Sequence, residues 1–167
     1  TLNDKSSFRI KTLKSNLNRL NFNAEVLNKD FLNFREDVKY DCIIIDAPCS
    51  SVGTIRKNPE IFFRSNMPDF KKLNKIQNSM LNKASNLLNI NGIILYMVCS
   101  FLKNETEDQI NYFLSQKKNF ELLKFNLKEK NIEYLKLVKK NCMITLPDIV
   151  KESNIDGYFA AYLKKVK

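Results

Sequence analysis

The sequence predicts an α/β fold with a largely parallel sheet, and two features carry this prediction. Short apolar runs rich in β-branched residues, typical of strands buried on both faces, occur at Cys42–Ile45 and Ile93–Val98. Between them, residues 69–88 repeat apolar side chains at helical spacing. Strands that alternate with helices favour a parallel sheet with helical crossovers. A chain of 167 residues is long enough to form one domain with a sizeable core.

The N-terminal part repeats a simple pattern of strand and aspartate. Thr1–Asn3 resemble the end of a strand, Lys5–Leu20 has the apolar spacing of a helix, and Ala24–Leu27 is a short strand candidate. Asp4 and Asp30 follow the two strands. An acidic residue at a strand end of a doubly wound sheet commonly binds ribose hydroxyls. Each aspartate taken alone is better explained as a helix cap or a turn residue.

The remaining elements continue the alternation. Asn91–Gly92 supplies a turn after the long helix, and Asp156–Gly157 supplies another before the last strand. In chain order, the remaining elements are an irregular or short helical piece at Pro59–Ser65, a helix at Glu105–Gln116, strand-like segments at Glu121–Phe125, Tyr134–Val138 and Met143–Leu146, and a strand at Tyr158–Leu163.

Composition argues against several classes of protein and of site. The chain has no histidine and its four cysteines lack Cys-x-x-Cys spacing, which disfavours a zinc site and Ser-His-Asp or Cys-His catalysis. No apolar run is long enough to span a membrane, and the first residues do not resemble a signal peptide. Free thiols fit a reducing compartment better than a disulfide framework, so we expect a cytoplasmic protein without a metal.

The net charge is strongly positive. It amounts to +10, with a pI near 9.4, and it favours a polyanionic partner such as RNA. A genome biased toward lysine and asparagine would produce the same charge, so the two explanations stay open. A lysine-rich patch from Lys124 to Lys140 is equally well explained as a solvated surface.

The stretch Asp41–Glu60 carries the residues that are most suited to chemistry. A short apolar strand ends there at Asp46, and a polar loop with Cys49 follows. Cys99 also comes directly after a strand, so we expect both thiols at the edge of the sheet where open α/β folds place their ligands. Such a pair suits either a redox couple or covalent attack on an electron-poor ring. The other two cysteines, Cys42 and Cys142, lie within apolar runs and are expected to be buried packing residues.

Four segments resemble motifs of the RNA (cytosine-5) methyltransferase family. D-A-P-C-S-S-V-G-T-I-R-K-N-P-E is similar to the family's fourth motif, and Y-M-V-C-S-F-L-K-N-E-T-E to its sixth. N-D-K-S-S-F-R-I is similar to the second motif, and D-G-Y-F-A-A-Y-L-K-K to the closing one. The resemblance covers essentially the whole chain with the motifs in order, and it is strongest to the bacterial 16S ribosomal RNA cytosine-C5 methyltransferases of the RsmB/Sun type.

The resemblance implies a mechanism and assigns three residues to it. Cys99 would attack carbon 6 of the target cytosine, which makes carbon 5 a nucleophile for the methyl group of S-adenosylmethionine. Cys49 would assist release of the covalent intermediate after the carbon 5 proton leaves. Asp46 would hold the pyrimidine near its ring nitrogen and favour the charge distribution of the adduct.

The resemblance also implies the cofactor and the RNA partner. Asp4 and Asp30 would bind the ribose and adenine of S-adenosylmethionine, with Asp46 close to the cofactor as well. Arg56 and Lys57 would contact RNA, most plausibly small-subunit ribosomal RNA, or would shape the loop. A surface salt bridge is the simpler explanation of this cationic pair.

The chain departs from the family's pattern in one major respect. The first motif, a strand with a glycine-rich loop that cradles the methionine part of the cofactor, is missing, and the chain has only three glycines. We therefore expect a Rossmann-like S-adenosylmethionine-dependent methyltransferase domain that is N-terminally incomplete, with residues 1–167 as the C-terminal part of a single catalytic domain. A separate N-terminal segment or chain would complete it.

Smaller departures and two rival functions accompany this expectation. Lys57, Val98 and Thr106 replace the family's usual arginine, threonine and asparagine. A catalytically inactive RNA-binding remnant is the main alternative, because the first motif is missing. A thiol redox protein is disfavoured, because Cys49 and Cys99 are far apart in sequence.

Overall fold

The computed structural model describes residues 1–35, 37–125, 138–139, 141–146 and 155–167. The chain divides into two compact units, Thr1–Val38 and Lys39–Lys167. The predicted strand at Tyr134–Val138, apart from Val138 itself, and most of the lysine-rich patch at 124–140 lie outside the described residues. Within the described residues, no helix is long and apolar enough to cross a membrane.

The first unit pairs two very short strands in parallel. β1 (Leu2–Asn3) and β2 (Val26–Leu27) flank helix α1 (Ser7–Leu20), and a 3-10 turn, η1 (Phe31–Asn33), follows. The side chain of Ser6 caps α1 by accepting a hydrogen bond from the Arg9 N–H. The predicted helix and strands are confirmed here, although both strands are shorter than expected.

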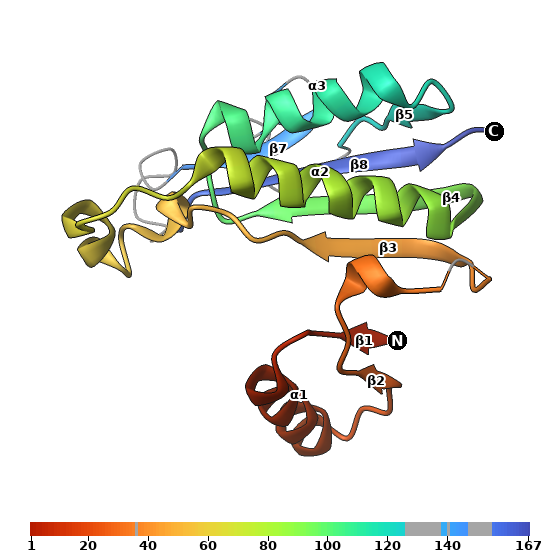
Figure 1. Cartoon of the computed structure of the whole chain (residues 1–167), viewed down its shortest axis with the longest axis horizontal. Coiled ribbons are helices and arrows are strands. Elements are labelled where there is room, and N and C mark those ends of the chain that lie inside the picture. The colour runs from red at the N-terminus through yellow and green to blue at the C-terminus, as the bar shows by residue number, and fades with distance from the viewer. Residues whose placement is uncertain (36, 126–137, 140, 147–154) are drawn as a thin grey trace, which may run out of the picture. The chain divides into compact units, whose positions relative to one another are not determined.

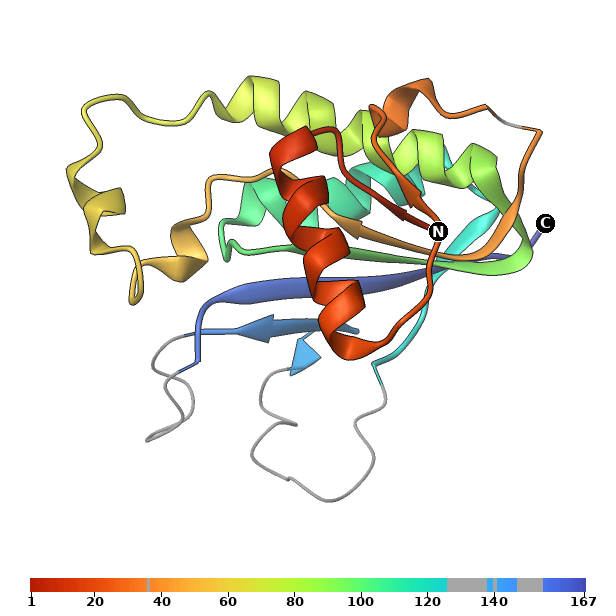
Figure 2. The ribbon, with the colours of Figure 1, turned by 90° about the horizontal axis from the view of Figure 1, so that it is seen from below.

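The second unit is a six-stranded sheet with helices on one face (Figures 1 and 2). The strand order is β3-β4-β8-β7-β6, with β5 also paired to β8. The elements are β3 (Tyr40–Asp46), η2 (Val52–Thr54), η3 (Pro59–Phe63), α2 (Phe70–Leu87), β4 (Leu88–Val98), η4 (Lys103–Glu105), α3 (Glu107–Gln116), β5 (Phe120–Leu122), β6 (Val138–Lys139), β7 (Cys142–Thr145) and β8 (Tyr158–Lys165).

The prediction of a largely parallel sheet is wrong for this unit. Among the described strands of this unit only the β3–β4 pair is parallel, and β8 runs antiparallel to β4, β5 and β7. A parallel neighbour needs a long crossover. β6 and β7, by contrast, are separated by only two residues in the sequence, so they pair as an antiparallel hairpin.

The core lies between the sheet and the two helices. Ile45, Tyr96 and Ala161 stand side by side on the helix-facing side of β3, β4 and β8, and all three are at most 2% exposed. Helices α2 and α3 lie over this face (Figure 1), and Leu81 of α2 and Phe113 of α3 are also buried. Because side chains alternate between the two faces of a strand, these residues all point toward the helices. The burial of their apolar surface stabilises the packing of the helices on the sheet.

The opposite face of the same strands is far more exposed. Ile44 is 63% exposed although Ile45 beside it is 2% exposed. Cys42 is exposed as well, so the expectations that Cys42–Ile45 is buried on both faces and that Cys42 is a packing residue are wrong. The physical reason is that β3 pairs with β4 alone among the described strands, so it is an edge strand of this sheet. Cys142 is 3% exposed, as expected.

The turn predicted at Asn91–Gly92 lies inside a strand. β4 starts at Leu88, and its pairing with β3 shifts register between Tyr40 and Cys42. Asn91 adopts a left-handed conformation with φ 64° within this irregularity. The turn residues therefore make a bulge, because the strand continues on both sides of them.

Candidate active site

The ends of two parallel strands bring the two predicted thiols together. Asp46, the last residue of β3, lies opposite Met97 near the end of β4, so Cys49 and Cys99 emerge at the same edge of the sheet. Their Sγ atoms are 3.4 Å apart, and both residues are half-buried. We call Cys49, Cys99 and Asp46 the thiol site.

The contact between the sulfurs makes the two thiols unequal. The hydrogen bond from the Cys49 thiol lowers the pKa of Cys99 to about 6, from an ordinary value of 9.0. The same contact, together with burial, raises the pKa of Cys49 far above its ordinary value. At neutral pH the pair therefore holds a Cys99 thiolate beside a protonated Cys49, which is the arrangement that a nucleophile with a neighbouring proton donor requires.

Ser51 adds a second contact to Cys99 through an uncommon backbone conformation. Its φ of 62° lies in the left-handed region, where the other non-glycine residues of the described chain are all asparagines. The conformation brings Ser51 Oγ within 3.5 Å of Cys99 Sγ, and this hydrogen bond also lowers the pKa of Cys99. A strained residue beside a reactive group is typical of functional sites.

Asp46 is exposed at the mouth of the thiol site. Its backbone is held in place because the Ala47 N–H donates to Met97 O at 3.0 Å. The charge of Asp46 acts on Cys99 and opposes the lowering of its pKa. Asp46 is exposed, so its carboxylate is accessible to a ligand.

A buried carboxyl group braces the loop that carries Cys49. Glu105 is completely buried and accepts hydrogen bonds from the Ser50 N–H at 2.8 Å and from Ser50 Oγ at 2.5 Å. Gln77 of α2 donates to Pro48 O at 3.0 Å and to Glu105 at 3.4 Å. Arg64 donates to Ser50 O at 2.9 Å. The residue next to Cys49 is thus held by its N–H, its hydroxyl and its carbonyl.

Two glycines join three chain segments behind the thiols. The Gly53 N–H donates to Cys99 O at 3.0 Å, and the Gly157 N–H donates to Gly53 O at 2.7 Å. A Cβ atom on Gly53 would lie 1.9 Å from Gly157 O, so only glycine permits this approach. The backbone hydrogen bonds tie the Cys49 loop to the ends of β4 and β8.

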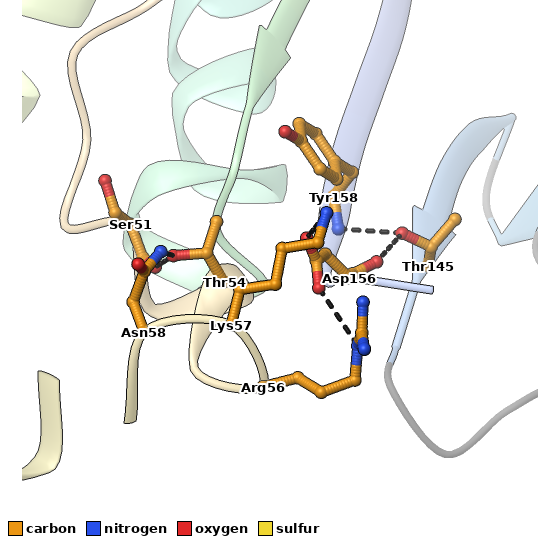
Figure 3. Close-up of polar contacts among 8 residues, drawn as sticks. All are labelled: Ser51, Thr54, Arg56, Lys57, Asn58, Thr145, Asp156 and Tyr158. Carbon is orange, nitrogen blue, oxygen red and sulfur yellow. Dashed lines mark hydrogen bonds and ion pairs between the residues drawn. The ribbon is translucent and has the colours of Figure 1, made fainter. Parts of the chain in front are cut away.

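The predicted cationic pair is held by an aspartate from the other end of the chain (Figure 3). Lys57 Nζ lies 2.7 Å from Asp156 Oδ2, and Arg56 Nε lies 3.3 Å from Asp156 Oδ1. The Asp156 side chain is 5% exposed, and the Lys57 hydrogen bond holds its pKa below the usual 3.8. Thr145 Oγ1 donates to Asp156 O and accepts from the Tyr158 N–H. The pair therefore shapes the loop, while Lys57 keeps 63% of its side chain exposed.

Tyr158 completes the surroundings of the thiol site from β8. Tyr158 is 41% exposed. Burial first, and then the charges of Cys99 and Asp46, raise the pKa of its hydroxyl. The charges of the thiol site therefore act on the Tyr158 hydroxyl.

The two N-terminal aspartates lie at the carboxyl ends of β1 and β2. Asp4 accepts a hydrogen bond from the Ser6 N–H at 2.7 Å and pairs with Arg9 at 3.1 Å. Asp30 caps η1 by accepting from the Leu32 N–H at 3.0 Å. Both aspartates thus have the cap or turn role that the sequence favours for each alone. Asp30 is exposed, and Asp4 is in part, so their carboxylates are also accessible to a ligand.

Sequence reasoning missed several residues that organise the thiol site. Glu105 and Gln77 were given no role, and Asp156 was read only as a turn residue. Glu105 and Asp156 do lie within the segments that resemble family motifs, and that was the available signal. Within the described part of the chain, no three Cys, Asp or Glu side chains gather in a way that would hold a metal ion.

Known proteins share both the sequence and the fold of this chain. Ribosomal RNA small subunit methyltransferase B of Shewanella oneidensis is 35% identical over 111 residues, which are 65% of this chain and 26% of that protein. 25S rRNA (cytosine-C(5))-methyltransferase nop2 of Schizosaccharomyces pombe is 31% identical over 175 residues, 98% of this chain and 29% of that protein. A crystal structure of a methyltransferase homologue from Pyrococcus horikoshii matches with a TM-score of 0.75 and 27% identity, over 98% of this chain and 52% of that one.

The chain thus spans between about a quarter and about half of the length of these proteins. The α/β fold is that of methyltransferase structures over nearly the whole chain. A family model described as 16S rRNA methyltransferase RsmB/F matches residues 1–164. This match confirms the resemblance carried by the motifs: the chain belongs to the RsmB/F family of RNA cytosine-C5 methyltransferases.

Proposed function

We propose that this chain forms the catalytic part of an enzyme that methylates carbon 5 of a cytosine in ribosomal RNA through a covalent cysteine–pyrimidine adduct. The observation that carries the proposal is the contact of 3.4 Å between Cys49 Sγ and Cys99 Sγ at the ends of β3 and β4. Membership of the RsmB/F family supports RNA cytosine as the target.

Attack on the base is assigned to Cys99. With a pKa of about 6, its thiol is mostly ionised at neutral pH. The sulfur forms a bond to carbon 6, and the electron pair of the 5,6 double bond moves to carbon 5. Asp46, exposed beside Cys99, holds the pyrimidine edge near its ring nitrogen and so favours the charge that develops in the ring.

Release is assigned to Cys49. S-adenosylmethionine supplies the methyl group for carbon 5 when it is bound. After the carbon 5 proton passes to water, the electron pair of that bond forms the 5,6 double bond again. The bond between carbon 6 and sulfur then breaks, and its electron pair returns to the Cys99 sulfur. The Cys49 thiol stays protonated because its pKa is raised, and it lies within hydrogen-bond distance of the departing sulfur. A hydrogen bond to the leaving thiolate favours this step.

The residues present fit only the nucleoside end of the cofactor. Asp30 offers an exposed carboxylate, and Asp4 a partly exposed one, at the carboxyl ends of β1 and β2, where ribose and adenine groups are commonly bound. Asp4 would have to exchange its pairing with the exposed Arg9 for the ligand. The methionine end requires a glycine-rich loop, and Gly53, Gly92 and Gly157 are all used for close packing elsewhere.

A further segment would complete the catalytic domain, of which residues 1–167 would be the C-terminal part. The support for this proposal is the exposed edge strand β3, with Ile44 63% exposed, together with the lack of a glycine-rich loop. Unpaired strand edges are ready partners for another strand. The segment would come from another part of the same protein or from a separate polypeptide.

The RNA partner is supported by charge and by the thiol-site loop. The chain carries a net charge of +10, and Lys57 remains 63% exposed while it pairs with Asp156. Arg56 is more enclosed at 35% and serves mainly to shape the loop. Binding to ribosomal RNA should therefore weaken steeply as salt rises, because phosphate contacts release counterions.

The deciding experiment follows the covalent adduct in a protein that joins this chain to the glycine-rich segment of a relative. RNA with 5-fluorocytosine blocks proton loss and traps the adduct, which a denaturing gel resolves. Cys99→Ala should form no adduct even on this substrate. Cys49→Ala should accumulate adduct on ordinary RNA, and Cys42→Ala, at an exposed cysteine outside the thiol site, should behave as the parent protein does.

Two outcomes would redirect the proposal. An adduct that survives Cys99→Ala but disappears in Cys49→Ala would exchange the roles of the two thiols. RNA binding without an adduct in the joined protein would instead support the alternative of an inactive RNA-binding remnant.

A further inference from the structure

Glu105 is a buried acid that the proposed reaction does not use. It is 0% exposed, and no cation pairs with it among the described residues. Burying a carboxyl group without a countercharge is costly unless hydrogen bonds replace its water. Three donor contacts do so here, from the N–H and hydroxyl of Ser50 and from the Gln77 amide. The buried Glu105 carboxyl group therefore carries a cost in folding free energy, which indicates that it has a specific role in the site.

Two of the three contacts of the Glu105 carboxyl group go to Ser50, the residue beside Cys49. Glu105 lies in the segment that follows Cys99, whereas Ser50 lies in the segment that follows β3. The carboxyl group therefore joins the two thiol-bearing segments directly. Gln77 makes the same connection from α2, and it leaves its own buried Oε1 atom without a partner among the described residues. An unsatisfied buried oxygen costs about 1–3 kcal/mol, so stability is given up for this arrangement.

We propose that Glu105 is a positioning residue that holds Ser50, and through it sets the Cys49 thiol against Cys99 Sγ. Without the two hydrogen bonds to Glu105, Ser50 itself keeps, among the described contacts, the Arg64 hydrogen bond to its carbonyl and a 3.4 Å contact to Ser100 Oγ, while Gln77 still holds the carbonyl of the neighbouring Pro48. The Cys49 thiol is then free to move off Cys99. Glu105 itself cannot touch substrate, because it is completely buried.

The proposal makes the ionisation of Cys99 depend on a residue that does not contact it. The groups that act on Cys99 are the Cys49 thiol, Ser51 and the charge of Asp46, and the Tyr158 hydroxyl lies nearby. Glu105 acts on Cys49, whose pKa its charge raises. Loss of the Cys49 contact should move the pKa of Cys99 from about 6 back toward its ordinary 9.0. A move of two pKa units would reduce the thiolate at pH 7 about tenfold.

The test measures the alkylation rate of each cysteine against pH by iodoacetamide labelling and peptide mass spectrometry on this chain. In the parent protein, Cys99 should reach half of its maximal rate near pH 6. Glu105→Ala should shift this midpoint upward and slow labelling at pH 7 about tenfold. Glu105→Gln keeps an acceptor for the Ser50 N–H and should recover part of the shift. Asp108→Asn removes the same charge from an exposed position nearby and should change nothing.

The four cysteines supply their own controls. Cys142 is buried, so its resistance to labelling reports that the fold is intact. Should Glu105→Ala expose Cys142, Ser50→Ala takes its place, because it removes one hydroxyl contact and keeps the N–H contact. An unchanged Cys99 profile in a variant that still protects Cys142 would overturn the proposal.

The inference rests on the proposed function only for the catalytic roles of Cys49 and Cys99. The labelling experiment itself needs neither RNA nor cofactor. In the joined protein, Glu105→Ala should slow adduct formation without weakening RNA affinity. A labelling shift without any adduct in the parent protein would sustain the positioning role and refute the methyltransferase reaction. An adduct in the parent protein without a labelling shift would do the reverse.

Discussion

The thiol site and the N-terminal aspartates are built very differently. Around the thiols, buried polar side chains such as Ser50, Ser100 and Glu105 are joined by hydrogen bonds that link distant segments. In residues 1–38, by contrast, Ile10 is the only buried residue among those described. Among the described contacts, the carboxylates of Asp4 and Asp30 bind only residues close to them in sequence.

The difference separates two requirements of the proposed reaction. Covalent chemistry needs atoms held at fixed distances, and this chain supplies that framework on its own. Cofactor binding needs a surface, and the chain contributes only two carboxylates to it. We infer that the chemical half of the site is preorganised in this chain, while the cofactor half depends on residues outside it.

The largest expected effect concerns the cofactor itself. This chain alone should bind S-adenosylmethionine more weakly than about 1 mM, because the methionine end has no glycine-rich loop to contact. The joined protein should bind at least about a hundredfold more tightly. Calorimetry on both proteins makes the comparison. Tight stoichiometric binding by the chain alone would break the contrast between the two halves.

The next effect contrasts the two faces of β3. Ile45→Ala should lower the free energy of unfolding by about 2–5 kcal/mol, because it opens a cavity under α2. Ile44→Ala, at the adjacent exposed residue, should change it by no more than about 0.5 kcal/mol. Urea denaturation of the two variants measures both values. Equal losses would show that the exposed face of β3 is covered in solution.

A smaller effect is expected behind the thiols. Gly53→Ala places a Cβ atom 1.9 Å from Gly157 O and 2.9 Å from Cys99 O, so the backbone must move apart. Overpacking of this kind typically costs about 1–3 kcal/mol. The same denaturation assay applies, with Ser65→Ala at an exposed position of the loop as control. A neutral Gly53→Ala would mean that the framework around the thiols is looser than its hydrogen bonds indicate.

The smallest effect concerns Asp156 and depends on pH. Pairing with Lys57, and then with Arg56, holds the pKa of Asp156 below its usual 3.8, so the pairing stabilises the fold at pH values above 3.8. This stabilisation is lost as pH falls through the lowered pKa. The difference in urea midpoint between the parent and Asp156→Asn should therefore be larger at pH 7 than at pH 3. A difference that is the same at both pH values would show that the charge of Asp156 does not contribute.

Local patterns in the sequence were sufficient to predict the positions of most helices and strands. They also predicted that Cys49 and Cys99 lie at the same edge of the sheet. Cys49 and Cys99 both follow apolar β-branched runs, and parallel strands bring such positions to one edge. Helix α2 was predicted to within a residue at each end, because its apolar face and the capping residue Asp69 are local signals.

Contacts between distant segments were not predictable in this way. Asp156 lies 100 residues from Arg56 in the sequence. No local pattern links the acid of the Asp156–Gly157 turn to a cationic pair so far away. The exposure of Cys42 and Ile44 was also missed, because a run of β-branched residues has the same composition in an edge strand as in a central one. The antiparallel pairing of β8 with β4 and β7 was not predictable either, because hydrophobic periodicity does not encode the direction of a strand.

The hydrogen bonds of Gly53 constrain how this region can vary in length. Its N–H is committed to Cys99 O and its carbonyl to the Gly157 N–H, so both sides of this peptide are anchored. An insertion or deletion between Cys49 and Gly53 would have to be absorbed within that short loop, and it would carry the Cys49 sulfur away from its partner. The backbone hydrogen bonds described for residues between Thr54 and Asp69 instead join residues that are at most four positions apart. Length variation among related chains should therefore fall after Gly53 and not before it.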